Sequence, residues 1–161
     1  MMESKLKVLD AVFRAVQDSF KTMAEIEVSQ GRVFNREESP VLEKIKIVAS
    51  IPLRSPPNFA GKLFLYISES IYLAILSKMV GQELTMESEE ALTGAGELLN
   101  IISGHVNLVL SKEGYSIKQD ELPKVLDEHD RSVLGMMLTN SLVLTFDSSL
   151  GNFFVEVQTN G

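Results

Sequence analysis

The apolar residues near the start of the chain repeat every three to four positions, which predicts an amphipathic helix. Six residues share this spacing: Leu6, Leu9, Phe13, Val16, Phe20 and Met23. In an α-helix they would all lie on one face, and Ser4, just before the run, is the expected N-cap. The polar stretch SQGRVFNREESP at 29–40 breaks the pattern and predicts a turn and loop.

Alternating apolar residues follow this stretch and predict two strands joined as a hairpin. In the segment KIKIVASIP, Ile45, Ile47, Ala49 and Ile51 alternate with less apolar residues. The segment RSPPN at 54–58 ends the first strand, because proline has no N–H to donate to a central ladder. The segment AGKLFLYIS at 60–68 is the second predicted strand.

Helical periodicity returns after this hairpin and predicts two helices. The first is the short segment ESIYLAILSKMVG, with Ser68 as its expected N-cap and Gly81 as its expected stop. The second is predicted to run from near Thr85 to about Gly114, which makes it the longest element of the chain.

The rest of the chain is rich in β-forming residues. The segment YSIK is at best a short strand, and SVLGMMLTNSLVLTF at 132–146 is interpreted as one long strand or a hairpin that breaks at Asn140-Ser141. NFFVEVQT at 152–159 is the last predicted strand. The order α-β-β-α-α-β-β predicts an α+β fold, with helices packed on a largely antiparallel β-sheet.

Charge and composition exclude several classes of partner. The formal net charge of −7 argues against nucleic acid and against an anionic membrane surface, since both require clustered Lys and Arg. The absence of cysteine excludes disulfides, thiolate metal sites and cysteine nucleophiles. The start MMESKLKVLD lacks the apolar core of a signal peptide, and no apolar run approaches the roughly 18–20 residues that span a bilayer. We therefore expect a cytoplasmic protein with protein partners.

One face of the predicted long helix is polar and rich in small residues. At about 100° per residue, one narrow sector holds Thr93, Glu97, Asn100, Gly104 and Asn107. The glycines at 94, 96 and 104 are costly, because each destabilises a helix by about 1 kcal/mol relative to alanine. Close approach of another surface, or tight packing against a helix of the same chain, would explain them. From the pattern alone, the sector is either a solvated helix face or a site.

The spacing of Glu97, two residues, Asn100, twenty-two residues and Pro123 resembles the signature of the CheC/CheX/FliY family of chemotaxis phosphatases. In that family an Asp or Ser stands four residues before the Glu, where this chain has Thr93, which keeps the hydroxyl of serine. The segment GKLFLYISESIYLAILSKMVGQEL also resembles the strand–helix–glycine segment of the family, and the β-rich tail resembles the CheX end. The resemblance covers roughly residues 40–160.

The resemblance is closest to CheX. Two-site members of the family carry a first copy of the motif on the N-terminal helix. Here that helix offers Asp10, Arg14 and Gln17 at comparable spacing, but Arg14 is not a carboxylate and Gln17 is not Asn. One site in a chain of this length predicts a single CheX-like phosphatase domain over residues 1–161.

The resemblance implies that the protein dephosphorylates the aspartyl phosphate of a CheY-type response regulator. In that reaction Asn100 would orient the attacking water, and Glu97 would engage a lysine near the phosphoryl group. An acyl phosphate already hydrolyses in water, so positioning and electrostatics are enough for catalysis. Three further positions on the same helix face are the predicted partner contacts, namely Thr93, Gly104 and Asn107. Pro123 would shape the turn into the next β segment.

The resemblance implies no cofactor of the protein's own, since Mg²⁺ would be bound by the regulator. No cluster of histidines or carboxylates in the sequence has convincing metal spacing. The carboxylates Glu87, Glu89 and Glu90 are interpreted as the solvated start of the long helix, where the helix dipole favours them. The family also implies a homodimer formed through sheet pairing.

Two other hypotheses remain. The same helix face would also suit a non-catalytic adaptor that binds a response regulator or a flagellar-switch component. Alternatively, the chain is an unrelated α+β binding domain in which the E-x-x-N spacing arose by chance. The presence of both Glu97 and Asn100 favours the enzyme over the adaptor, and turnover of a phosphorylated receiver distinguishes the two.

Overall fold

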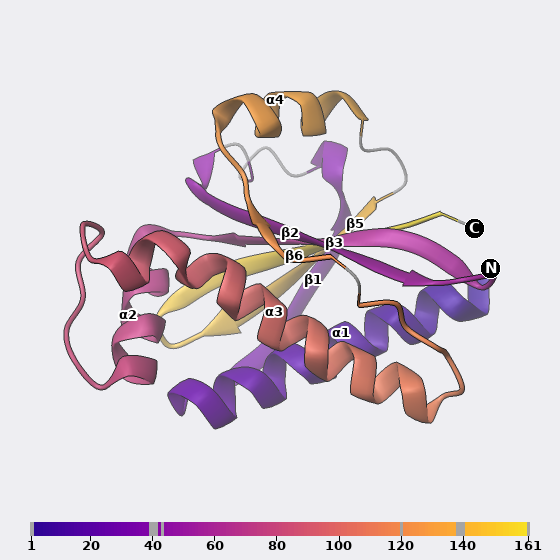
Figure 1. The fold of residues 1–161 in the computed structure, drawn as a ribbon, viewed down its shortest axis with the longest axis horizontal. Coiled ribbons are helices and arrows are strands. Elements are labelled where there is room, and N and C mark those ends of the chain that lie inside the picture. The colour runs from indigo at the N-terminus through magenta and orange to yellow at the C-terminus, as the bar shows by residue number, and fades with distance from the viewer. Residues whose placement is uncertain (1, 39–41, 43, 120, 138–140, 161) are drawn as a thin grey trace.

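Helices pack against a six-stranded sheet in the computed structural model of the chain (Figure 1). The structure describes residues 2–38, 42, 44–119, 121–137 and 141–160. In chain order the elements are α1 (Met2–Ala24), β1 (Val28–Asn35), the 3₁₀ helix η1 (Arg36–Glu38), β2 (Ile47–Ser55), β3 (Phe59–Ile67), α2 (Glu69–Val80), α3 (Glu89–Lys112), β4 (Lys124–Val125), α4 (Glu128–Met137), β5 (Ser141–Ser148) and β6 (Gly151–Asn160).

The sheet has the strand order β1-β5-β6-β3-β2-β4, and its named strands all pair in antiparallel fashion. Strands β2 and β3 form the predicted hairpin, with Ile47 opposite Ile67 and Ser55 opposite Phe59. Strands β5 and β6 form a second hairpin. The predicted α+β class, with helices on an antiparallel sheet, is confirmed.

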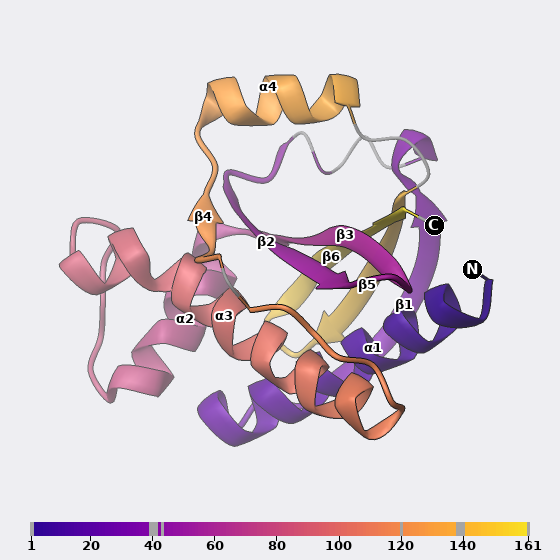
Figure 2. The same cartoon turned by 45° about the vertical axis from the view of Figure 1, so that its right-hand side comes forward.

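Both faces of the sheet are covered, which explains the continuous apolar run LFLYI in β3. Leu63, Leu65 and Ile67 point to the larger core, which the helices α1, α2 and α3 complete. Phe64 and Tyr66 point to a smaller apolar cluster on the opposite face. Figure 2 shows α1 and α3 on one side of the sheet and α4 on the other.

Helix α2 begins and ends where the sequence predicts. Ser68 precedes it with an extended backbone, and its Oγ accepts a hydrogen bond from the backbone N–H of Ile71 at 3.5 Å. Gly81 follows it with φ of 81°, a left-handed conformation that glycine adopts without strain, and its N–H donates to the Ser77 carbonyl. Helix α3 begins at Glu89, four residues later than predicted, and ends at Lys112.

The prediction of a loop at 29–40 is wrong, because most of this segment forms β1 and η1. β1 is an edge strand of the sheet, and most of its side chains are exposed. It therefore lacks the alternation of buried and exposed positions that identifies a half-buried strand. Its place in the sheet comes from backbone pairing with β5. Residues 39 and 40 lie outside the described residues.

The prediction of a strand from residue 132 is also wrong, because this part of the chain belongs to helix α4. The Asp127 carboxylate accepts a hydrogen bond from the Asp130 backbone N–H at 2.8 Å, and the Asp130 carboxylate accepts one from the Asp127 N–H at 3.3 Å. This reciprocal capping starts a helix. The bond from Asp127, followed by that from Lys124, lowers the pKa of Asp130. Of the predicted break at Asn140-Ser141, Asn140 lies outside the described residues and Ser141 begins β5.

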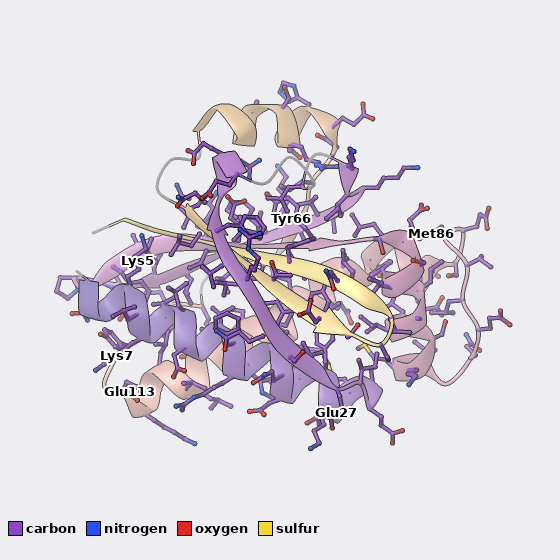
Figure 3. All side chains as sticks on the ribbon, turned by 180° about the vertical axis from the view of Figure 1, so that it is seen from behind. Lys5, Lys7, Glu27, Tyr66, Met86 and Glu113 are labelled. Carbon is purple, nitrogen blue, oxygen red and sulfur yellow. The ribbon has the colours of Figure 1, made fainter. Side chains whose placement is uncertain are left out.

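A buried charged group lies on the face of the sheet that α4 covers. The Glu156 side chain is fully buried and accepts hydrogen bonds from Tyr66 Oη at 2.6 Å, Arg36 Nη1 at 2.5 Å and Ser141 Oγ at 2.5 Å. Burial and the neighbouring Glu156 carboxylate raise the pKa of Tyr66, so its hydroxyl remains a donor. Figure 3 shows Tyr66 between the sheet and α4. This cluster attaches η1 to β3, β5 and β6.

Candidate functional site

Helix α3 has one buried face and one exposed face. Five apolar side chains on the buried face have no exposed surface: Leu98, Leu99, Ile102, Val106 and Leu110. Thr93, Glu97 and Asn100 are exposed, while Gly104 and Asn107 are half-buried. The helical period therefore places the five residues of the polar sector along one side of α3, away from the core.

The three glycines of α3 have different surroundings. A Cβ on Gly94 would lie 2.8 Å from Tyr72 Oη and 2.9 Å from Leu76 Cδ1, so this glycine allows α2 to pack closely on α3. A Cβ on Gly96 would be in ordinary contact with Pro123, 3.6 Å from its Cγ. A Cβ on Gly104 would meet nothing within 4 Å. Packing within the chain thus explains Gly94 and leaves Gly104 without a steric reason.

The fold brings Pro123 next to the polar sector, although twenty-two residues separate it from Asn100. Figure 2 shows the segment after α3 running back along the helix to β4. There Val125 pairs with Ala49 of β2, and the Leu126 N–H donates to the Val48 carbonyl at 2.8 Å. Pro123 therefore packs over α3 beside Gly96, one position before Glu97.

An open hollow of about 560 Å³ lies between this part of α3 and the crossing segment, residues 122–125. Its lining combines two residues of the E-x-x-N motif with several apolar side chains, and consists of Thr93, Gly96, Glu97, Asn100, Ile101, Leu122, Pro123 and Val125. A hollow of this composition suits a protein surface that presents both apolar and polar groups.

A second hollow, of about 240 Å³, lies on the other side of Asn100. It is lined by Ile51, Pro52, Asn100, Ser103, Gly104, Lys118, Gln119, Glu121 and Leu122. Asn100 and Leu122 are the residues that both linings share. The sequence motif did not indicate Leu122, and its only signal was its place immediately before Pro123.

The polar side chains of the sector differ in whether they are already engaged. Within the described part of the chain, the Glu97 carboxylate and the Asn100 amide make no hydrogen bond or ion pair. Thr93 Oγ1 donates weakly to the Glu89 carbonyl at 3.5 Å, and Asn107 Oδ1 accepts from Ser111 Oγ at 3.1 Å. Glu97 and Asn100 are therefore available to an external partner, whereas Asn107 would first have to break its hydrogen bond with Ser111.

The described residues include no group of three or more His, Cys, Asp or Glu side chains that could hold a metal ion. The carboxylates Glu87, Glu89 and Glu90 are exposed at the start of α3. His105 is half-buried and His129 is exposed, and neither lines the two hollows. Of the helices in the described ranges, none is long and apolar enough to cross a membrane.

Comparison with known proteins identifies similar sequences and structures. The family model described as chemotaxis phosphatase CheX matches residues 47–147. No curated protein matches the chain.

Several solved structures share the fold. A chemotactic CheC-like protein from Shewanella oneidensis MR-1 is 21% identical, with a TM-score of 0.76 over 97% of this chain and 99% of that one. The chemotaxis protein CheX from Vibrio vulnificus is 18% identical, with a TM-score of 0.73 over 95% and 99% of the two chains. The CheX–CheY–BeF₃–Mg²⁺ complex from Borrelia burgdorferi contains a chain that is 16% identical, with a TM-score of 0.69 over 95% and 97%. At these identities the structures show a common fold.

Proposed function

Because the chain belongs to the family of the chemotaxis phosphatase CheX, we propose that it is a cytoplasmic phosphatase that hydrolyses the aspartyl phosphate of a CheY-type response regulator. The observation that carries this proposal is the pair Glu97 and Asn100. Both side chains are exposed, lie one turn apart on α3 and border the same hollow. The complex of CheX with CheY, beryllium fluoride and Mg²⁺ from Borrelia burgdorferi supports a receiver as the partner.

Asn100 is proposed to hold the attacking water. Its amide offers both a donor and an acceptor, so it can orient one water molecule in line with the phosphorus. A carboxylate at this position would repel the phosphoryl oxygens. Because Asn100 lies where the two hollows meet and has no partner among the described residues, its side chain can reach a phosphoryl group without breaking a bond within the chain.

Glu97 is proposed to pair with a lysine of the receiver near the phosphoryl group. Its carboxylate stands beside the apolar groups of Ile101, Pro123 and Val125 and lacks a cation among the described residues. An ion pair with the receiver would fix the register of α3 on the partner. It would also place Asn100, three residues further along the same face.

The remaining site residues are proposed to act through contact and shape. Thr93, Gly104 and Asn107 would touch the receiver along the exposed side of α3, and Pro123 would hold the crossing segment against Gly96. No cofactor is assigned to the chain. Mg²⁺ is expected on the receiver, in keeping with the Mg²⁺ named for the CheX–CheY complex.

We also propose that residues 1–161 act as a single CheX-like domain and form a homodimer through sheet pairing. Strand β1 is at one end of the sheet and has one neighbour, β5, in the described structure. An edge strand offers outward backbone N–H and C=O groups to a second chain, although at the two ends of β1 the Val28 carbonyl accepts from Gln17 and the Asn35 N–H donates to Glu38. The strand at the other end, β4, has only two residues.

The replacement Asn100→Ala tests the catalytic assignment. Wild-type protein is expected to accelerate phosphate loss from a phosphorylated CheY-type receiver. The kcat of Asn100→Ala is expected to be lower than that of the wild type by about 100-fold or more. Because Asn100 is exposed, the variant should keep the thermal stability of the wild type. Asn152→Ala, a change of an exposed asparagine in β6 that lines neither hollow, is the matched control and should retain full activity.

Two outcomes would contradict this proposal. If the wild type does not accelerate phosphate loss, the protein is not a phosphatase for that receiver. If Asn100→Ala turns over as fast as the wild type, Asn100 does not hold the water. Binding of the receiver without turnover would instead support the adaptor hypothesis.

A further inference from the structure

Leu122 has an unusual place for an exposed leucine. The residue is 87% exposed, the largest value among the large exposed hydrophobic residues that the structure describes. A single exposed leucine is common on protein surfaces and by itself indicates nothing. Leu122, however, lines both hollows that flank Asn100. It therefore borders the same two hollows as Asn100, the residue proposed to hold the attacking water.

The chain on both sides of Leu122 is attached to the rest of the protein. Before it, the Lys118 N–H donates to the Arg54 carbonyl of β2 at 2.9 Å. After it, Pro123 packs beside Gly96, and Lys124 pairs with Ser50 of β2. The backbone on both sides of Leu122 is therefore attached to β2 and α3, so docking costs less backbone conformational freedom than it would for a free loop.

The surroundings of Leu122 indicate the chemistry of the surface that would cover it. The adjoining hollow contains the apolar side chains of Ile101, Pro123 and Val125, together with the Glu97 carboxylate, which has no ion-pair partner among the residues that the structure describes. A complementary surface has a basic side chain opposite Glu97 and an apolar side chain next to it. A partner that offered only apolar groups would bury the Glu97 carboxylate without compensation, which is costly.

We propose that Leu122 is the apolar anchor through which this protein docks on its receiver. Its side chain packs against an apolar residue that neighbours the basic group paired with Glu97. This inference rests on the proposed function and assigns different roles to two residues of the site. Leu122 determines the affinity for the phosphorylated receiver, whereas Asn100 determines the rate of hydrolysis once the receiver is bound.

The test is a steady-state comparison of Leu122→Ser with the wild type, using a CheY-type receiver phosphorylated by acetyl phosphate. Loss of one buried leucine at the interface should raise KM about 10- to 100-fold, with kcat unchanged within twofold. Leu6→Ser is the matched control, because Leu6 on α1 is also exposed, at 60%, and lines neither hollow. Both variants should melt at the wild-type temperature.

Binding to a receiver loaded with beryllium fluoride and Mg²⁺, measured by fluorescence anisotropy, separates this inference from the proposed function. If the wild type turns over and Leu122→Ser has the same KM and Kd as the wild type, the anchor is refuted and the phosphatase stands. If the wild type binds without turnover and Leu122→Ser weakens binding, the anchor is supported and the phosphatase is refuted. If the wild type neither binds nor turns over the receiver, both are refuted.

Discussion

Replacing Gly104 by alanine separates the stability of α3 from its use as a contact surface. The glycine lies inside a 24-residue helix, on the side that carries Glu97 and Asn100. An added Cβ would meet nothing within 4 Å. The free protein therefore has no steric need for glycine here, and a partner that approaches the helix closely would supply one.

The expected stability change follows from helix propensity. Glycine in a helix interior is about 1 kcal/mol less favourable than alanine. Because the added methyl group at Gly104 has open space around it, no clash offsets this gain. We expect the free energy of unfolding of Gly104→Ala to rise by about 1 kcal/mol and its melting temperature by about 2–4 °C, the usual scale for a chain of this length.

The expected effect on activity has the opposite sign. If the receiver lies against Gly104, the extra methyl group overpacks the interface at a cost of about 1–3 kcal/mol, which lowers kcat/KM about 5- to 150-fold. The assay pairs urea denaturation with phosphate release from the phosphorylated receiver. A variant that is more stable and less active than the wild type is the expected result.

Alanine replacements of two other glycines in α3 serve as controls for the effect of helix propensity on stability. Gly94→Ala would place a Cβ 2.8 Å from Tyr72 Oη and 2.9 Å from Leu76 Cδ1, so it should destabilise the protein despite the gain in propensity. Gly96→Ala would make ordinary contact with Pro123 at 3.6 Å and should be stabilising. If Gly104→Ala is no more stable than the wild type, the argument from helix propensity fails. If it is more stable and fully active, no partner approaches Gly104.

Two further predictions concern the sheet. Glu156→Ala leaves Arg36 and Tyr66 without their shared acceptor inside the protein and should lower the free energy of unfolding, measured by urea denaturation, by about 3 kcal/mol. Glu156→Gln keeps an acceptor oxygen and should lower it less. A loss below about 1 kcal/mol for Glu156→Ala would show that these hydrogen bonds contribute little to stability. Light scattering at micromolar concentration should give twice the 17.8 kDa mass of one chain, and a monomeric mass would refute the proposed homodimer.

Elements with strong local signals could be predicted from the sequence. The apolar spacing of α1, and the Ser68 and Gly81 signals at the ends of α2, depend on residues a few positions apart. The hairpin of β2 and β3 followed from two alternating runs with a proline-rich turn between them. In each case the determining interactions lie within the segment, so the segment contains the information.

Elements whose signals conflict or are absent could not be predicted in the same way. Strand β1 is polar on most of its positions and owes its extended form to backbone pairing with β5, more than a hundred residues away. At α4, the apolar and β-branched content of 132–137 favoured a strand. The hydrogen bonds between Asp127 and Asp130 start a helix instead, and these two residues precede the segment that was predicted as a strand.

The sequence by itself determined that Glu97 and Asn100 share one face of a helix, because the helical period requires it. Only the tertiary structure decided what surrounds them. Close packing of α2 explains Gly94, while Gly104 stays open. The return of the chain to β2 brings Pro123 and Leu122 beside Asn100. Spacing along a helix is a local property, so the sequence pattern predicts it. The residues that line the site come from segments far apart in sequence, and their contacts form only when the chain folds.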